Sequence, residues 1–342
     1  MSTANLDSAD LKAVTRGGLI REDVMNKIWD ISKVPLPFTD MVGEDTHKNA
    51  YCEWTTDALA APDIANAAID GADTTGNDTA VGKRVGNQSQ ISKKVVRVSF
   101  RADASDTIGR AKELAYQISR RQQELRRDVE AIALTNQASV ADDGSSTAGK
   151  VGGLPSWLTQ NQGGTAGGFA TGTGLTVARV PTATRALTET MIRAAVLSVY
   201  NSGGDPTVLM TMPAIIGLIS AYLFSSSARV ATLMSDIEGS ASKATAMGAV
   251  NVFVTDFGTL KLIPNRLQQS HVDSGSTQVS DVFILDPQYL SLSYIGGYRT
   301  EDLAKTGLAN NKLMTVDWSL KVLNDKAQAI IGDIGLATAM TA

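Results

Sequence analysis

The sequence predicts an α+β protein in which one long amphipathic helix packs on a β-sheet and a region of mixed helices and strands follows. Apolar residues recur at helical spacing over residues 105–136. Apolar and polar residues alternate, as in strands, at 51–56 and 312–322. No repeat of fixed period occurs, which excludes solenoids and propellers. The 342 residues, 43% of them hydrophobic, suffice for one large domain or two closely associated subdomains.

The long helix is the most distinct predicted element. At ~1.5 Å per residue, a helix over 105–136 is roughly 48 Å long, well beyond the usual globular helix. Two alanines and one glutamine in its stripe argue against a coiled coil, so we expect a spine that lies on a sheet. The stripe consists of Ile108, Ala111, Ala115, Ile118, Gln122, Leu125, Val129 and Ile132. The other faces carry Arg120, Arg121, Glu124, Arg126, Arg127, Asp128 and Glu130.

The chain before this helix indicates extended structure. Residues 1–40 form a predicted arm, with a short amphipathic helix at 21–32 that ends before Pro35 and Pro37. Predicted strands at 51–56 and 94–101 flank an insert rich in Ala, Asp, Gly, Thr and Asn. Two strands separated by such an insert bury little in their own subunit. We therefore expect an extended two-stranded arm that lies on a neighbouring subunit.

The second half has the pattern of a compact helix-and-strand unit. It follows a Gly/Ser/Thr-rich region at 141–174, which we expect to be a surface loop and a subdomain boundary. Helices are predicted at 184–200 and 213–224, and a hairpin at 250–254 and 259–263 with its turn at Asp256-Phe257-Gly258. Further strands are predicted at 207–211, 282–285, 312–322 and 327–331.

Positive charge is concentrated in residues 83–127. This segment has twelve basic and four acidic residues, so its net charge is +8, and the overall charge of −4 leaves −12 for the rest. Such a distribution suits head-to-tail contacts between copies of one chain. The basic residues either pair with acids of neighbouring subunits, which we favour, or face DNA through sequence-independent phosphate contacts. The candidates for either role are Lys93, Lys94, Arg97, Arg101, Arg110, Arg120, Arg121, Arg126 and Arg127.

Composition and motifs argue against an enzyme. A single cysteine, Cys52, excludes an intramolecular disulfide, and two histidines, His47 and His271, exclude a His-rich metal site. The longest apolar run is too short to cross a bilayer, and no signal peptide precedes it, so we expect a soluble protein made in the cytoplasm.

Three local motifs are explained without a catalytic or nucleotide-binding role. Residues 144–150 (GSSTAGK) match a P-loop up to Lys150, but Val151 replaces the Ser or Thr that follows and no helix begins there. The S-x-x-K match at 240–243 lacks its companion motifs. Asp281 and Asp286 at the ends of one apolar strand are interpreted as turn formers. No credible nucleophile or phosphate cradle remains, and we expect no cofactor.

Several stretches resemble one family of phage major head proteins. They are 124–134 (ELRRDVEAIAL) with its continuation into Gly152-Gly153-Leu154, 248–258 (GAVNVFVTDFG), 262–266 (LIPNR), 282–287 (VFILDP), 302–307 (DLAKTG) and 320–327 (LKVLNDKA). None is a chemical motif, but their order covers residues 20–332. The order of elements likewise resembles the Hong Kong 97-type capsid fold of tailed bacteriophages.

The resemblance implies a major capsid protein in the virion, assembled in the host bacterial cytoplasm. Hexamers and pentamers would tile a shell around double-stranded DNA, with a portal, a decoration protein and a separate scaffolding protein as possible partners. It further implies five parts: an N-terminal arm (1–45), an extension loop (46–100), a peripheral subdomain with spine helix and boundary loop (101–174), an axial subdomain (175–280) and strands returning to the peripheral subdomain (281–342). The alternative is a DNA-binding architectural protein that uses residues 83–127, which would bind duplex DNA with steep salt dependence.

Overall fold

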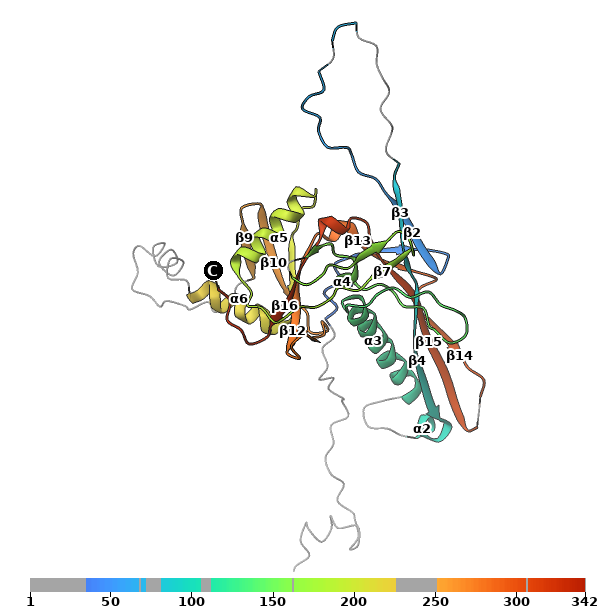
Figure 1. Ribbon diagram of the computed structural model, residues 1–342. Coiled ribbons are helices and arrows are strands. Elements are labelled where there is room, and N and C mark those ends of the chain that lie inside the picture. The colour runs from blue at the N-terminus through green and yellow to red at the C-terminus, as the bar shows by residue number, and fades with distance from the viewer. Residues whose placement is uncertain are drawn as a thin grey trace, which may run out of the picture.

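The computed structural model describes residues 35–67, 69–71, 81–105, 112–161, 163–225, 251–305 and 307–341. Two larger β-sheets form the body, each with helices beside it, and a two-stranded hairpin projects from the body as a long loop (Figure 1). The helix expected at 21–32 and the S-x-x-K motif at 240–243 lie outside the described residues. Within the described ranges, no helix is long and apolar enough to cross a membrane.

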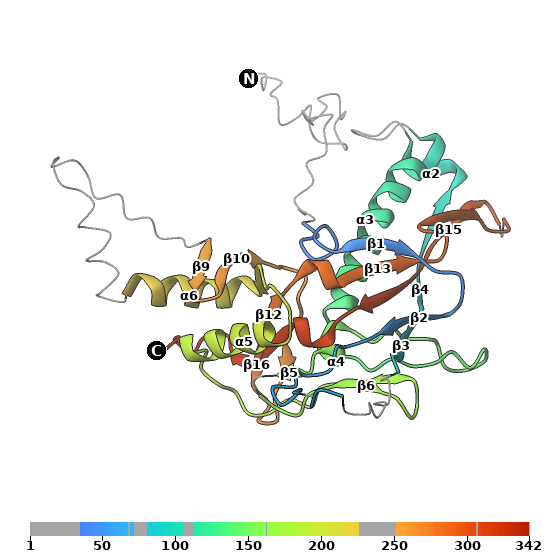
Figure 2. The same cartoon turned by 90° about the horizontal axis from the view of Figure 1, so that it is seen from above.

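The first sheet is built around its longest strand, β15. Strand β4 runs antiparallel along one edge of β15, from Gln90 opposite Trp318 to Ser99 opposite Ala309. Strands β13 and β14 share the other edge, and β1 pairs parallel with β13 (Figure 2). The strands are β1 (Gly43–Thr46), β4 (Gln90–Ser99), β13 (Leu290–Tyr294), β14 (Arg299–Asp302) and β15 (Ala309–Val322).

The spine helix α3 (Glu113–Ala133) covers one face of this sheet. Alternation along β4 places Val96 and Val98 on that face, where they share a core with Leu125 and Val129 of α3. The helix is shorter than the prediction of 105–136. A separate short helix, α2 (Phe100–Ala104), precedes it and ends at Ser105, whose backbone is extended. Residues 106–111, with Ile108 and Ala111 of the predicted stripe, lie outside the description.

The buried face of α3 also differs from the predicted stripe. It consists of Leu125, Val129, Glu130 and Ala133, whereas Ala115 is exposed. The face is therefore turned towards Glu130, which the sequence pattern placed on the solvent side. The reason is that two neighbours contact the helix from different directions, the first sheet and the turn at residues 38–39.

The projecting hairpin consists of β2 (Tyr51–Thr56) and β3 (Lys83–Gln88), paired from Tyr51–Gln88 to Thr56–Lys83. This corrects the expectation that 94–101 is the second strand of the arm. That segment belongs to β4, because Val96 and Val98 are buried under α3 and bind it to the body. The arm is thus shorter than predicted at its base. The described residues of the insert between its strands, 57–67, 69–71 and 81–82, form no helix or strand and leave the body (Figure 1).

The second sheet lies between two layers. Helices α5 and α6 pack on one face and share a core with Leu209, Leu262 and Ile284. The alternate residues Met210 and Phe283 point to the opposite face and join the core of the first sheet. Its order is β5-β16-β12-β8-β10-β9, with β11 paired to β12. The elements are β5 (Gln160–Asn161), β8 (Val208–Thr211), β9 (Val252–Thr255), β10 (Gly258–Pro264), β11 (His271–Val272), β12 (Gln278–Leu285), β16 (Ala329–Gly335), α5 (Glu189–Asn201) and α6 (Pro213–Ser225).

The sheet order corrects one expectation about the C-terminal part. Only β13, β14 and β15 return to the first sheet. Strands β12 and β16 pair with each other, and β12 also pairs with β8, so both lie in the middle of the second sheet. All but one of their residues are buried, as is typical of central strands. The short 3-10 helices η2 (Pro287–Tyr289) and η3 (Asp325–Ala327) mark the crossings between the two sheets.

The glycine-rich region at 141–174 is only partly the surface loop that was expected. Its middle forms the short helix α4 (Leu154–Trp157), and Leu154, Trp157 and Leu158 belong to the core of the first sheet. A Cβ at Gly153 would lie 1.9 Å from the Thr135 carbonyl oxygen, so only glycine permits this approach to the end of α3. Beyond it, β6 (Gly168–Ala170) and β7 (Leu175–Val177) form a small hairpin.

Candidate assembly surfaces and a buried ionic cluster

The loop between β2 and β3 presents apolar side chains to solvent. Leu59, Ile64 and Ile69 are between 82% and 101% exposed, and Val81 at the other end is 90% exposed. The loop stands clear of the body (Figure 1), so the subunit itself covers none of them. Isolated exposed apolar residues are ordinary, but several on one projecting loop are typical of an interaction surface.

One face of β4 is likewise open. Ile91, Lys93, Val95 and Arg97 alternate with the residues that face α3, and all four are exposed. Strand β4 is also an edge strand, since in the described part of the chain it pairs with β15 and no other strand. Within the same part, neither Lys93 nor Arg97 has an ion-pair partner. Both the face and the edge are therefore accessible to another chain.

The other predicted basic residues are distributed over several surfaces, and some are engaged within the subunit. Lys94 faces α3 and forms an ion pair with Asp128 (2.7 Å). Arg121 pairs with Glu124 one turn on, and the Arg126 guanidinium lies 5.4 Å from the centre of the Tyr298 ring. Of the remaining positions, Arg101 is exposed on α2, Arg120 and Arg127 are half-buried on α3, and Arg110 lies outside the described residues.

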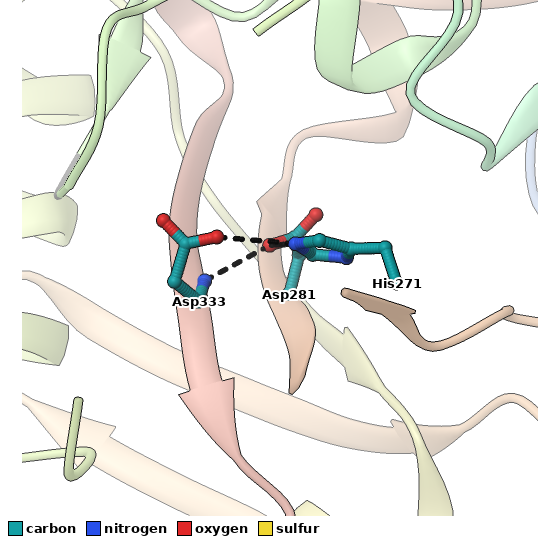
Figure 3. Close-up of side chains that lie close together, drawn as sticks. All are labelled: His271, Asp281 and Asp333. Carbon is teal, nitrogen blue, oxygen red and sulfur yellow. Dashed lines mark hydrogen bonds and ion pairs between the residues drawn. The ribbon is translucent and has the colours of Figure 1, made fainter. Parts of the chain in front are cut away.

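A buried ionic cluster lies at the centre of the second sheet. Arg179 is fully buried and donates through Nη1 to Asp333 Oδ2 (2.9 Å), and through Nη2 to Asp333 Oδ1 (3.0 Å) and Asp281 Oδ1 (2.9 Å). His271, on β11, places Nε2 3.1 Å from Asp333 Oδ1 (Figure 3). The two carboxylates thus share one guanidinium.

Local backbone geometry aims both carboxylates at this point. The register between β12 and β16 shifts between Ser280 and Val282, a bulge that brings Asp281 opposite Asp333. Asp333 has φ 64°, in the left-handed region that non-glycine residues seldom adopt, and its N–H donates to Asp281 Oδ1 (3.2 Å). A Cβ at Gly332 would lie 2.4 Å from Arg179 Nη1, so glycine leaves room for the guanidinium.

The cluster has the residue types of a metal site, but its geometry is that of an ion pair. Three potential ligand atoms, one from each of His271, Asp281 and Asp333, lie within 4.8 Å of one another. Arg179 Nη2 lies 2.9–3.2 Å from all three of these atoms and thus occupies the position that a cation would take. The guanidinium supplies the positive charge in place of a metal ion.

The environment shifts the pKa values of the two aspartates in opposite directions. Burial raises the pKa of Asp281, against the attraction of Arg179 and His271. Burial acts on Asp333 in the same direction, but hydrogen bonds from His271, Arg179 and the Thr182 N–H outweigh it and hold the pKa of Asp333 well below its usual range. Of the two carboxylates, Asp333 is therefore the one that the cluster holds in its ionised form.

A second buried carboxylate joins three segments of the chain. Glu130 of α3 accepts hydrogen bonds from the Phe38 N–H (2.9 Å), the Thr39 N–H (2.7 Å) and the Thr39 hydroxyl (2.6 Å). The Asn265 side-chain amide, just beyond β10, donates to it at 2.7 Å. Glu130 thereby ties the entry to β1 and one end of the second sheet to the spine helix.

In the P-loop-like stretch, the backbone N–H groups are already bound by Asp143, the residue that precedes it. The Asp143 carboxylate accepts from the N–H groups of Ser145, Ser146 and Thr147 at 2.8–2.9 Å. Hydrogen bonds from Thr147 and its neighbours hold the pKa of Asp143 far below its usual range. These are the N–H groups that a phosphate cradle would need, so the loop is an aspartate-capped turn and not a nucleotide site.

Sequence reasoning missed Arg179, Asp333 and Glu130. Asp281 was interpreted as a turn former, which is wrong, because it lies inside β12 and pairs with Arg179; Asp286 does cap η2. The available signal was an ionisable residue inside an apolar strand, in QVSDVFIL and AIIGDIG. Such positions are seldom charged unless the charge is paired. Glu130 carried no comparable signal.

Comparison with solved structures identifies the fold. The chain is similar to the capsid protein of cyanophage A-1(L) (TM-score 0.61, 12% identity, 95% of this chain and 99% of that chain). It is also similar to the capsid of a native GTA particle (0.60, 10%, 97% and 100%) and to the SrpI encapsulin of Synechococcus elongatus PCC 7942 (0.54, 12%, 99% and 99%). At these identities the likeness establishes the fold alone, the Hong Kong 97-type fold of shell-forming proteins. The predicted α+β class and fold type are confirmed.

Sequence comparison identifies the family. The major capsid protein of Escherichia phage Phieco32 is 36% identical over 113 residues, which span 33% of this chain and only 32% of that relative. The sequence model of the SU10 major capsid protein family matches residues 3–335. The chain therefore belongs to the SU10 major capsid protein family, and the resemblance to major capsid proteins of tailed phages is confirmed.

Proposed function

We propose that many copies of this chain assemble through hexamers and pentamers into the closed icosahedral head of a tailed bacteriophage. Family membership and the shell-protein fold support the role, and the projecting loop supports the mode of assembly. In this extended loop Leu59 and Ile64 are nearly fully exposed, an apolar surface that a neighbouring subunit would cover. Many modest contacts of this kind make a closed shell stable.

The two sheets correspond, in this proposal, to two subdomains. The first sheet with α3 is the peripheral subdomain, and the second sheet with α5 and α6 is the axial subdomain, which gathers around the fivefold and sixfold axes. The N-terminal arm and the hairpin β2–β3 reach neighbouring copies. Strands β12 and β16 are assigned here to the axial side, because they pair with β8.

The exposed basic residues have their role between subunits. Lys93, Arg97 and Arg101 lie on accessible surfaces and suit pairing with acids of neighbouring copies. The overall charge of −4 opposes a strong DNA-binding surface. Packaged DNA, a scaffolding protein, a portal and a decoration protein remain further expected partners, and assembly takes place in the host cytoplasm.

The proposal assigns no catalytic step to the chain. Asp281 and Asp333 both pair with Arg179, and burial raises the pKa of the Cys52 thiol. Glu130 is enclosed by hydrogen bonds. These groups are thus engaged in holding the fold.

The proposal is tested by sedimentation of the overexpressed chain followed by negative-stain electron microscopy. Closed shells, or rings of five and six subunits, are expected. A persistent monomer, even when neighbouring phage genes are co-expressed, would contradict it. Duplex DNA binding by the isolated subunit that weakens steeply with salt would instead support the architectural DNA-binding alternative.

A further inference from the structure

We propose that the His47 ring is a proton-sensitive clasp, which holds the base of the β2–β3 hairpin against the first sheet when it is neutral and releases it when it is protonated. The inference concerns the single subunit and is independent of how copies assemble. Three properties of the molecule carry it: the position of the ring, its two hydroxyl partners, and the charges that surround it.

The ring lies where the hairpin joins the body. His47 belongs to the connection 47–50 between β1 and β2, and its Nδ1 lies 2.9 Å from the hydroxyl oxygen of Ser293 on β13. Its Nε2 lies 2.6 Å from the hydroxyl oxygen of Ser89, the single residue between β3 and β4. One side chain therefore joins both chain segments that enter the hairpin to a strand of the first sheet.

The connection 47–50 is otherwise held mainly by its backbone. Its last three residues are exposed. In the described part of the chain, two backbone hydrogen bonds also hold it: the His47 N–H donates to the Tyr294 carbonyl oxygen (3.2 Å), and the Ser89 N–H donates to the Ala50 carbonyl oxygen (2.8 Å). Loss of the ring contacts would therefore loosen this connection before it affects the two sheets.

The hydroxyl partners suit a neutral ring. In a neutral imidazole one nitrogen donates and the other accepts, so one serine accepts a hydrogen bond while the other donates one. A protonated ring donates from both nitrogens, and the serine that donated must then turn its hydroxyl hydrogen away. Ser293 is fully buried, so a hydrogen bond lost there is not readily replaced by bulk water.

The surroundings of the ring oppose a positive charge. Burial lowers the pKa of His47 and the Lys321 ammonium group on β15 lowers it further, whereas Asp45 on β1 acts in the opposite direction. Asp45 and Lys321 form an ion pair with each other, so the carboxylate is already compensated. The Cys52 thiol on β2 is hydrogen-bonded to Ser293 and is uncharged, since burial raises its pKa. In the described part of the chain, these are the titratable groups that face the ring from β1, β2 and β15.

The pH range follows from the sign of this effect. Because the folded pKa of His47 lies below its unfolded value of about 6.5, the released ring binds a proton more tightly than the clasped ring. The clasp therefore contributes fully above about pH 6.5 and weakens as the pH falls below that value.

Amide hydrogen exchange of the full-length, unassembled subunit tests the clasp, with protection factors corrected for the intrinsic exchange rate at each pH. From about pH 7.5 to about pH 5.5, protection of the Ser89 amide should fall at least about threefold. His47→Gln, which does not titrate, should show no such fall. Protection within β8, in the second sheet, should remain unchanged, which separates local opening from global unfolding.

The matched control is His271→Gln, which removes the other histidine of the chain and should keep the pH dependence at Ser89. In this variant the His47 ring is followed alone by NMR, and its titration midpoint should lie below about 6.5. The inference is overturned if the wild type keeps full protection of Ser89 at the lower pH, or if His47→Gln shows the same fall. It is also overturned if His271→Gln abolishes the fall, if β8 loses protection equally, or if His47 titrates at or above about 6.5.

Discussion

Asn136 and Arg179 exchange two hydrogen bonds: the Asn136 amide donates to the Arg179 carbonyl oxygen (2.7 Å), and the Arg179 N–H donates to Asn136 Oδ1 (2.9 Å). Asn136 follows the end of α3, whereas the side chain of Arg179 enters the second sheet. The backbone of one residue is thus fixed to the spine helix while its guanidinium holds β12 and β16 together. Arg179 links the two halves of the body.

We predict that Arg179→Met lowers the free energy of unfolding by about 3–5 kcal/mol, because two buried carboxylates lose their shared counter-charge. Urea unfolding of the unassembled subunit measures this. The control is Arg193→Met, which removes surface pairs with Glu189 and Asp256 and should cost no more than about 1 kcal/mol. Equal losses for the two variants would show that Arg179 is not a clamp.

The acid sensitivity of the fold should depend on Asp333. Because its folded pKa lies below its unfolded value of about 3.9, its stabilising contribution is present above about pH 4 and is lost as the pH falls below that value. Asp333→Asn, which tolerates the left-handed backbone, should be less stable at pH 7 but should decline less steeply between pH 4 and 2. Thermal unfolding across this range measures both slopes, and parallel slopes would refute the assignment.

Glu130→Ala should destabilise the subunit by about 3 kcal/mol, since it leaves buried donors of Phe38, Thr39 and Asn265 unsatisfied. It should also expose the chain near Thr39 to limited proteolysis, which reports local release of this segment. Glu124→Ala on the same helix, where the side chain is partly exposed, should change stability by less than about 1 kcal/mol. Unchanged proteolysis in Glu130→Ala would contradict the anchoring role.

The glycine-rich region should behave as core at its centre. Leu154→Ala is expected to cost about 2–5 kcal/mol, as for other fully buried leucines. Leu308→Ala removes the same atoms from a side chain that is 83% exposed and should stay within about 0.5 kcal/mol. Chemical denaturation of both variants decides the matter. A small effect at Leu154 would restore the interpretation of 141–174 as a surface loop.

Elements set by local signals could be predicted from the sequence. Helix α6 and the β9–β10 hairpin were predicted close to their observed bounds, because apolar periodicity and the turn before Gly258 are local signals. Helix α5 was predicted too, but it begins at Glu189, after the Thr188 cap, and not at residue 184. The spine helix was predicted in position but not in length or in its buried face. Periodicity identifies a helix, yet its neighbours decide which side they bury.

Features that depend on distant partners could not be predicted. The pairing of Arg179 with Asp281 and Asp333 spans 102 and 154 residues, and Glu130 meets Phe38 and Asn265 across 92 and 135 residues. The arm was assigned the wrong second strand for the same reason, since β4 belongs with β15 far along the chain. Only the ionisable residues in otherwise apolar strands hinted at the buried cluster.

In the proposed function, copies of this chain build a closed head shell through the projecting loop. A three-dimensional electron cryomicroscopy reconstruction of particles from the overexpressed chain is the decisive measurement. We expect icosahedral shells with five and six copies around the symmetry axes, in which each loop between β2 and β3 lies on a neighbouring copy. Particles without icosahedral order, or shells in which every such loop remains uncovered, would contradict it.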